Sequence, residues 1–416
     1  MVSHTIESLP RYKGIERARK RLGYLLLYLK ILIVDTVISI TNRGATQHDL
    51  VLLIRMDAIG DFIVWLDAAR AIVKHYRNQD KRVVLLGNVT WADWARDLNL
   101  FDSVIAIDRK GFLQSLSYRW RIGLQVRKLA CATAIYPSYS REWLLGDALV
   151  RISGARERIG SSGDNYHSTR WQQRIANLWY TRLVSADSAP QMELKRNAEF
   201  VRNLCDANFT AKVLDLRAIT TLALDARWRV AIPQEESYYV MFPGAGWSGR
   251  RWPIGNFAQI AQKLYVKTGW HGVICGGDED RSIGEELCKQ SSAPLLNCCG
   301  ETHLTQLAAI VASAKLLVAN ETSAMHIAAA CGVPTVCILG GGDYGRFLPY
   351  EVERPSSTAL PYPVTFPMSC FGCRWQCIYH RLDSEPTPCI GQISITTVWE
   401  IVDKIVGHGA MTIRLD

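Results

Sequence analysis

The chain has 416 residues, of which 48% are hydrophobic and 21% are charged, a composition typical of folded globular proteins that excludes general disorder. This length exceeds one ordinary domain and fits two domains of ~100–200 residues each. Lys and Arg outnumber Asp and Glu by 48 to 39, and the net charge of +9 favours an anionic small molecule or an anionic membrane surface as partner. A nucleic-acid partner is disfavoured, because no long basic run is interleaved with aromatic residues.

The N-terminal segment differs from the rest of the chain. Seven residues between positions 11 and 30 are basic and one is acidic, and an apolar stretch covers residues 22–40. Lys30 and Asp35 interrupt that stretch, and a charge near the centre of a spanning helix costs about 2.5–3.5 kcal/mol, which disfavours a membrane span. A helix lying in the headgroup region of an anionic membrane fits, and so does a helix packed on the protein's own surface. We predict a membrane-associating segment and linker over residues 1–48, and we expect the domains to survive removal of its first 40 residues.

Strand-like and helix-like segments alternate from residue 50 onward. Short apolar runs predict buried strands at 51–55, 83–86 and 104–107, and helical spacing of apolar residues predicts helices at 62–77 and 91–98. This alternation is typical of a parallel sheet with right-handed crossovers. We predict an N-terminal domain over residues 49–232, although residues 153–221 are polar and show no clear pattern.

A second alternating series begins at residue 238. The pattern predicts strands at 239–242, 272–275, 316–319 and 335–339, with helices at 256–267, 280–290, 304–313 and 323–330. We predict a C-terminal domain over residues 233–395, including a cysteine-rich tail at 370–389, followed by a C-terminal helix within 396–416. The two series together predict the α/β class, with two facing Rossmann-like domains and a cleft between them.

Ligands of such sheets bind beyond the carboxyl ends of the strands, so the loops there hold the candidate site. The first of these loops contains Asp57, Gly60 and Asp61. Gly60 allows the backbone to turn tightly and to approach a ligand closely. Asp61 has two interpretations, as the N-cap of the following helix or as a general base in the cleft.

The second loop is rich in glycine and ends in two arginines. Gly244 and Gly246 leave backbone N–H groups free for an anion, and Arg250 and Arg251 offer the bidentate geometry that suits phosphate. The alternative is a flexible surface turn with solvated charges. We predict donor-phosphate contacts from this loop.

Two further loops supply polar groups. Thr322 and Ser323 open an Ala-rich helix whose N-terminus suits a phosphate, and Glu321 can accept bonds from sugar hydroxyls. His326 lies one turn into that helix, where a buried structural histidine is the competing interpretation. Glu279 follows two glycines at a strand end and can bind a ribose or simply begin a helix. None of the loops matches the dinucleotide, P-loop, metalloprotease or nucleophile-elbow motifs, which disfavours hydride transfer and P-loop hydrolysis.

Four of the twelve cysteines cluster near the C-terminus. Their spacing approaches that of metal ligands, with two residues, three residues and eleven residues between Cys370, Cys373, Cys377 and Cys389. Four thiolates suit a structural Zn²⁺ or an iron centre, and four reduced thiols without metal are the alternative. The other cysteines are scattered through predicted strands and helices, which indicates a reducing compartment.

Taken together, these loops resemble those of the family 9 glycosyltransferases, the ADP-heptose:lipopolysaccharide heptosyltransferases and their relatives. The resemblance lies in four segments: LLIRMDAIGDFIVWLDAARAI, MFPGAGWSGRRWPIGNFAQIAQKL, ICGGDEDRSIGEEL and GETHLTQLAAIVASAKLLVANETSAMHIAAACGVPTVCILGG. The chain departs from the usual family pattern at Glu321, where Asp is common, at Ser323, where Gly is common, and at Gly340–Gly342, which replace a Phe-Gly-Pro run.

The resemblance implies a GT-B fold and an inverting transfer of a sugar, heptose by family default, from a nucleotide-diphosphate donor, without a catalytic metal. It implies a lipopolysaccharide or other cell-surface glycan as acceptor, and an enzyme on the cytoplasmic face of the plasma membrane. In this family Asp61 corresponds to the base, Arg250 or Arg251 to the residue that neutralises the leaving diphosphate, and the segment from Asn320 to His326 to donor contacts. The last helix is expected to cross back onto the first domain. A catalytically inactive nucleotide-binding protein and a nucleotide-sugar epimerase of the same shape are the alternatives.

Overall fold

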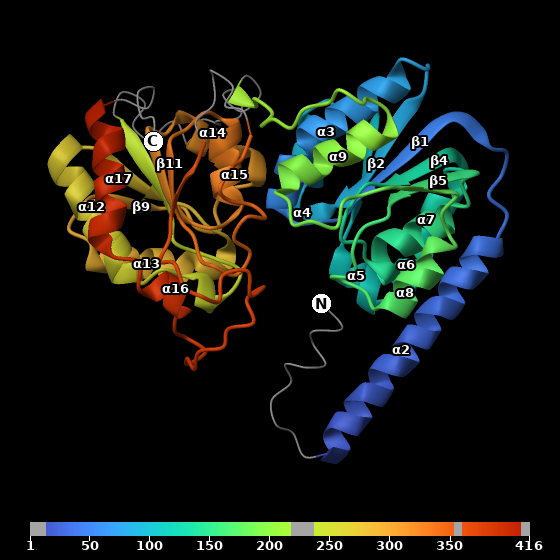
Figure 1. Ribbon diagram of the computed structural model, residues 1–416, viewed down its shortest axis with the longest axis horizontal. Coiled ribbons are helices and arrows are strands. Elements are labelled where there is room, and N and C mark those ends of the chain that lie inside the picture. The colour runs from blue at the N-terminus through green and yellow to red at the C-terminus, as the bar shows by residue number, and fades with distance from the viewer. Residues whose placement is uncertain (1–13, 218–236, 353–359, 409–416) are drawn as a thin grey trace. The chain divides into compact units, whose positions relative to one another are not determined.

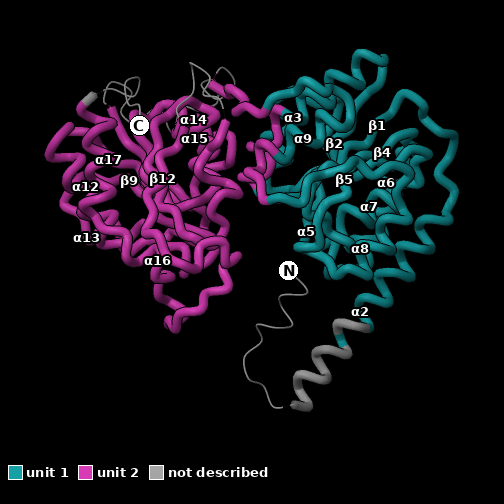
Figure 2. Tube along the Cα trace, in the orientation of Figure 1, with its two compact units in different colours: residues 1–58, 68–189, 196–210 teal, residues 59–67, 190–195, 211–416 magenta. Residues whose placement is uncertain are grey.

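The structure, a computed structural model, describes residues 14–217, 237–352 and 360–408. The described residues form two compact units, drawn in two colours in Figure 2. Unit 1 comprises residues within 1–58, 68–189 and 196–210, and unit 2 comprises residues within 59–67, 190–195 and 211–416. Two short segments of the N-terminal half, 59–67 and 190–195, therefore belong to unit 2.

Unit 1 is built on a six-stranded parallel sheet with the order β3-β2-β1-β4-β5-β6. The strands are β1 (Gln47–Arg55), β2 (Arg82–Asn88), β3 (Ser103–Ile107), β4 (Cys131–Tyr136), β5 (Glu157–Ser161) and β6 (Arg182–Val184). The helices are α3 (Ile59–Arg77), α4 (Val89–Asp97), α5 (Arg109–Gln114), α6 (Leu116–Lys128), η1 (Trp143–Asp147), α7 (Ala148–Ser153), α8 (Arg170–Asn177) and α9 (Glu193–Leu204). This strand order is the Rossmann order.

Two expectations for this unit change. β1 begins at Gln47, inside the predicted linker. The apolar pattern does not reveal its first three residues, because they are polar and exposed, whereas the last six are buried. The unpatterned stretch 153–221 contains β5, β6, α8 and α9. These elements are short and partly polar, so they gave no periodic signal.

The N-terminal helix α2 (Gly14–Ile40) packs on unit 1, beside α6 and α7 in Figure 1. Ile38 is fully buried in the core of that unit, and Ile31 packs against Trp143. Asp35, which interrupts the apolar stretch, is buried in an ion pair with Arg119. These buried contacts count against the expectation that the domains survive removal of residues 1–40, because the second half of α2 belongs to the core of unit 1. In the part of the chain that the structure describes, no helix has the length and apolar character required to cross a bilayer.

Unit 2 also has a six-stranded parallel sheet, with the order β12-β11-β10-β7-β8-β9. Its strands are β7 (Tyr238–Phe242), β8 (His271–Ile274), β9 (Leu295–Asn297), β10 (Leu316–Asn320), β11 (Thr335–Ile338) and β12 (Tyr362–Val364). The helices are η2 (Ser248–Arg250), α12 (Ile254–Thr268), η3 (Asp278–Asp280), α13 (Arg281–Gln290), α14 (Leu304–Ser313), α15 (Ser323–Ala330), α16 (Pro388–Gly391) and α17 (Ile395–His408). Two parallel sheets confirm the predicted α/β class.

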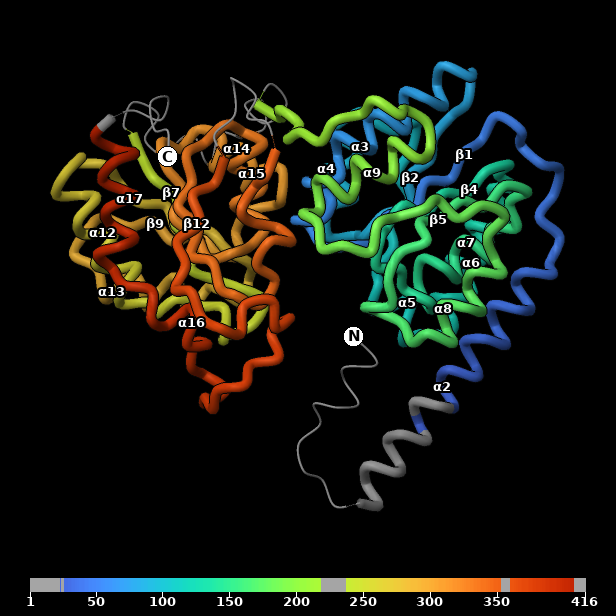
Figure 3. The backbone as a smooth tube through the Cα atoms, in the orientation of Figure 1, coloured from blue at the N-terminus to red at the C-terminus, as the bar shows by residue number. Residues whose placement is uncertain are grey.

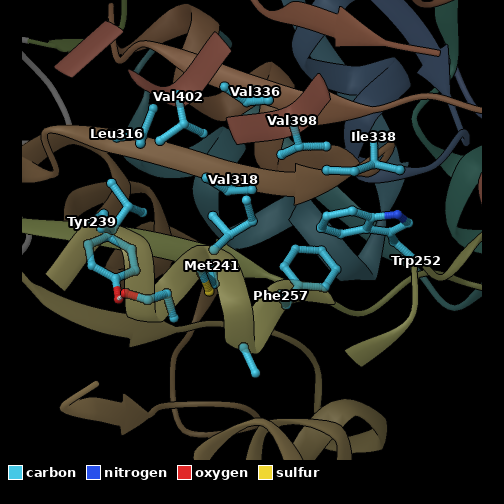
Figure 4. Packing of buried hydrophobic residues seen from close by; sticks show 14 of the residues in the cluster. Tyr239, Met241, Trp252, Phe257, Leu316, Val318, Val336, Ile338, Val398 and Val402 are labelled. Carbon is cyan, nitrogen blue, oxygen red and sulfur yellow. Dashed lines mark hydrogen bonds between the residues drawn. The ribbon is translucent and has the colours of Figure 1, made fainter. Parts of the chain in front are cut away.

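The core of unit 2 lies between the sheet and the helices that cover it. β7, β10 and β11 are buried along their whole length, as expected for strands covered on both faces. Val398 and Val402 of α17 pack in this core with the strand residues Val336 and Ile338 (Figure 4). α17 runs beside α12 (Figure 3), so the expectation that the last helix packs on the first domain is wrong.

Candidate functional site

Two loops meet where the central strands of the unit 2 sheet, β7 and β10, reach their carboxyl ends. β7 and β10 are parallel neighbours, with Phe242 opposite Ala319, so the glycine-rich loop after β7 lies beside the loop after β10. The fully buried Asn320 joins them: its Nδ2 donates to the Pro243 carbonyl at 2.6 Å, and its Oδ1 accepts from the Trp252 N–H at 3.1 Å. This amide holds the start and the end of the glycine-rich loop against β10.

Arg250 and Glu321 form the charged centre of this end of the sheet. Arg250 Nη2 donates to the Glu321 backbone carbonyl at 2.8 Å and lies 3.1 Å from its carboxylate Oε2. Burial raises the pKa of Glu321 to about 7, with Arg250 acting in the opposite direction and Asp343 adding to the rise. Arg250 Nε and Glu321 Oε2 are buried, and within the described residues neither has a hydrogen-bond partner. The pair thus keeps unused donor and acceptor capacity beside the loop.

Arg251 is held by different partners from Arg250. Its Nε and Nη2 donate to the Ala245 carbonyl at 3.2 and 3.0 Å, and its Nη2 lies 3.7 Å from Oδ1 of Asp280. Asp280 packs directly on Gly244, since a Cβ there would lie 2.2 Å from its carboxylate. Arg251 therefore binds within its own loop, whereas Arg250 binds Glu321 in the loop after β10.

The N-terminus of α15 borders the same pair. Its N-cap is Thr322, which makes no side-chain capping bond, and Ser323 is the first helical residue. The Thr322 hydroxyl oxygen is buried and has no hydrogen-bond partner among the described residues. A helix N-terminus with an unused hydroxyl is a favourable place for an anion.

His326 lies in the interior of unit 2. Its Nδ1 is hydrogen-bonded to the Tyr350 hydroxyl, and its ring also contacts Phe347. Burial lowers its pKa to about 3, so the imidazole is neutral at physiological pH. These contacts favour the structural interpretation of this histidine.

Gly60 and Asp61 lie at the start of α3, in the segment that belongs to unit 2. The helix begins at Ile59 with Ala58 as its N-cap, so the interpretation of Asp61 as the N-cap is wrong; it is the acidic residue of the first turn. A Cβ at Gly60 would lie 3.0 Å from the His326 ring. Gly246 and Glu279, by contrast, are exposed.

Arg346 is a neighbour of this site that sequence reasoning missed. It binds Glu193 through Nε and Nη2 at 3.0 and 2.9 Å, and its pKa is raised by Glu193 first and then by Asp61 and Asp343, despite the opposing effect of burial. Arg346 lies in a turn outside any motif, 153 positions from Glu193, so no local spacing could have identified it.

The four clustered cysteines are not arranged as metal ligands in the structure. Cys370, Cys373 and Cys377 are partly exposed, whereas Cys389 is buried and accepts from the Gly341 N–H at 3.5 Å. The other three thiols add to the rise in the pKa of Cys373 caused by burial, so the four are neighbours. Over the described ranges, however, no three His, Cys, Asp or Glu side chains are grouped so that they could hold a metal ion. All twelve cysteines are free, and the structural metal stays a prediction.

Comparison with known proteins gives a family match. The model of "Glycosyltransferase family 9 (heptosyltransferase)" matches residues 150–361, about half of the chain. That range contains Arg250, Glu321 and His326 but neither Asp61 nor the clustered cysteines. Lipopolysaccharide heptosyltransferase 2 of Salmonella typhimurium is 33% identical over 103 residues, which are 24% of this chain and 29% of that protein. The chain thus matches less than a third of the length of this curated relative.

Solved structures match over most of the chain. The glycosyl transferase family 9 protein from Veillonella parvula aligns with a TM-score of 0.68 and 15% identity, over 88% of this chain and 100% of that one. The E. coli heptosyltransferase WaaC with ADP-2-deoxy-2-fluoro heptose aligns with a TM-score of 0.61 and 14% identity, over 85% and 99% of the two chains. At these identities the likeness shows the fold, which is the GT-B fold of the heptosyltransferases.

Proposed function

Because this chain belongs to glycosyltransferase family 9, we propose that it transfers a sugar from a nucleotide-diphosphate donor to a glycan acceptor. The observation that carries the proposal is the Arg250–Glu321 pair at the edge where β7 and β10 end. A guanidinium with an unused donor, beside a helix N-terminus with an unused hydroxyl, suits a diphosphate.

We propose ADP-heptose as the first donor to test, because the WaaC structure holds an ADP-heptose analogue. In this proposal Arg250 and the N-terminus of α15, with Thr322 and Ser323, bind the diphosphate and stabilise its charge as it leaves. Glu321 pairs with Arg250 in the free protein and can accept hydrogen bonds from sugar hydroxyls. Positive charge fixed where negative charge develops lowers the barrier to bond cleavage.

Asp61 is the proposed general base. A carboxylate can remove the proton from an acceptor hydroxyl as that oxygen attacks the anomeric carbon, and displacement from the face opposite the diphosphate inverts the configuration. Asp61 interacts electrostatically with Arg346, whose pKa it raises.

The proposed acceptor is lipopolysaccharide or another cell-surface glycan, made at the cytoplasmic face of the plasma membrane. Support comes from α2, which buries one face on unit 1 and exposes a row of apolar side chains on the other. The row consists of Leu26, Leu29, Ile33, Val37 and Ile40. These positions recur every three or four residues, so they share one helix face, and the basic residues precede them in the sequence. An apolar face with basic neighbours is typical of helices that lie on anionic membranes.

A binding screen followed by a transfer assay tests the proposal. Ligands that bind only the native state raise the melting temperature, so ADP and ADP-sugars should stabilise the protein more than adenosine does at the same concentration. Transfer of heptose to a truncated lipopolysaccharide core would then establish the activity. Binding without transfer to any acceptor would indicate the catalytically inactive alternative, and equal stabilisation by adenosine and ADP would refute the diphosphate site.

A further inference from the structure

We infer that Trp375 is a positioning residue, whose indole ring holds the guanidinium of Arg250 toward the nucleotide-diphosphate site. The inference rests on the proposed function, which makes a diphosphate the ligand of Arg250. It also gives a role to the cysteine-rich segment (residues 370–389), to which Trp375 belongs and which the proposed reaction leaves unexplained.

Arg250 is held by groups from two distant parts of the chain. Its guanidinium carbon lies 5.0 Å from the centroid of the Trp375 ring, within the range of a cation–π interaction. Its Nη2 binds the Glu321 carbonyl at 2.8 Å. Because a guanidinium is planar, contacts to one ring and to one nitrogen leave it little freedom to rotate.

The Trp375 ring is itself fixed. Its Nε1 donates to Oδ2 of Asp343 at 2.8 Å, and the ring of Trp247 packs against it edge to face at 6.0 Å. Its face lies directly on the backbone, since a Cβ on Gly342 would approach the ring to 2.2 Å. Only glycine allows this approach, which gives a physical reason for the departure from the usual family residues at Gly342.

The backbone under this ring adopts an uncommon conformation. Arg374 and Trp375 have φ angles of +52° and +62°, in the left-handed region that bulky residues rarely occupy. Two hydrogen bonds hold the segment on the glycine run, from the Arg374 N–H to the Gly342 carbonyl at 2.8 Å and from the Gly372 N–H to the Gly341 carbonyl at 2.7 Å. Such strain persists where surrounding contacts determine the conformation, and here it serves to present the indole.

The cysteine-rich segment also holds the backbone next to Arg250. The N–H and the hydroxyl of Thr387 both donate to the Gly249 carbonyl, at 2.8 and 2.9 Å. The backbone just before Arg250 and the end of its side chain are therefore both held by this segment. We therefore assign to this segment the placement of Arg250.

The test measures the affinity for ADP and for adenosine in a double-mutant cycle. Trp375→Leu removes the ring face, and a partly exposed cation–π contact of this kind corresponds to a loss of about 3- to 10-fold in ADP affinity. Adenosine affinity should not change, and the KM for the donor sugar nucleotide should rise by a similar factor. In an Arg250→Ala background, Trp375→Leu should have no further effect on ADP affinity.

Trp399→Leu is the matched control, because the Trp399 ring also carries a cation, Lys263 at 5.3 Å, but lies on α17. It should leave ADP affinity unchanged. If Trp375→Leu does not fold, Trp375→Phe replaces it in the cycle, because it loses the Nε1 donor to Asp343 that fixes the ring. The loss of ADP affinity should then be smaller, and it should again be absent in the Arg250→Ala background. An equal loss of ADP affinity with and without Arg250 would overturn the positioning role. No loss in Arg250→Ala itself would instead refute the phosphate site of the proposed function.

Discussion

Arg119 and Asp35 form a doubly hydrogen-bonded ion pair, with Nε and Nη2 of the arginine each 2.6 Å from a carboxylate oxygen and both side chains buried. The pair links α2 to α6, two helices that are separated in the sequence by the elements from β1 to α5. It explains how a charged residue can lie within the apolar stretch of the N-terminal segment. It also predicts what removal of that charge does.

Asp35→Ala should destabilise unit 1 by about 3–5 kcal/mol, because it leaves the guanidinium of Arg119 buried without its counter-charge. Urea unfolding followed by circular dichroism measures the change. Asp93→Ala removes the carboxylate of an exposed pair with Arg96 and serves as the control. It should change the stability by less than about 1 kcal/mol. A similar small effect for both variants would show that the Asp35–Arg119 pair does not contribute to holding α2 on unit 1.

The exposed row on α2 should mediate binding to anionic membranes. Replacing Leu29, Ile33 and Val37 by Gln should reduce co-sedimentation with phosphatidylglycerol-containing vesicles while leaving the melting temperature nearly unchanged, since these side chains are exposed. Val266→Gln, at a still more exposed position on α12, is the control. Equal pelleting of all these proteins would count against a membrane-bound face.

Arg250→Ala should weaken ADP binding about 10- to 100-fold, the value of one charge-assisted contact. Arg251→Ala should have a much smaller effect, because Arg251 is bound to the Ala245 carbonyl and to Asp280. Isothermal titration with ADP and adenosine separates the phosphate contribution from that of the nucleoside. A larger loss for Arg251→Ala than for Arg250→Ala would reverse this assignment of the two arginines.

Asp61→Asn should lower kcat by about 10²–10⁴-fold, since the amide cannot accept the proton of the acceptor hydroxyl. Donor affinity and the melting temperature should stay close to those of the unmodified protein. The matched control is Asp57→Asn, which changes a carboxylate of the same loop that is bound to Arg55 and Ser138. Transfer at the normal rate by Asp61→Asn would exclude this residue as the base.

Glu321 should make the stability of unit 2 depend on pH. Its pKa of about 7 in the native state lies above the ordinary value of 4.5, so proton binding favours the native state. This stabilisation is complete below about pH 4.5 and is lost as the pH rises through about 7, with a total of about 3 kcal/mol. Urea unfolding between pH 5 and pH 8 should show a decline that is absent in Glu321→Gln. Identical pH profiles for the two proteins would contradict the raised pKa.

The sequence predicts those parts of the fold that depend on local pattern. The strands of both sheets are continuous apolar runs, and the glycine-rich loop and the Asn320–Ser323 loop follow two of them directly, so their meeting at one sheet edge follows from parallel pairing. Parts that depend on distant partners could not be predicted. In the sequence Asp35 only interrupts an apolar stretch, and its buried ion pair with Arg119 is visible only in the structure. The inferred role of Trp375 likewise depends on its contact with Arg250, 125 positions earlier in the chain.

The two arginines illustrate the same limit at a smaller scale. Arg250 and Arg251 are adjacent and chemically equal in the sequence, so spacing cannot distinguish them. Their side chains bind different partners, and only the positions of Glu321 and Asp280 show which arginine contacts which loop.

The hydrogen bonds from Thr387 to the Gly249 carbonyl have a consequence for protein synthesis. Translation proceeds from the N-terminus, so the glycine-rich loop emerges from the ribosome 138 residues before the threonine that supports it. The sheet of unit 2 can pair up to β12 during that interval, whereas the loop lacks its outer contacts until residue 387 has been made. A nascent chain would thus complete the strands of unit 2 before it can support the proposed nucleotide site, and premature termination after β12 would remove the contacts of this loop together with the core residues of α17.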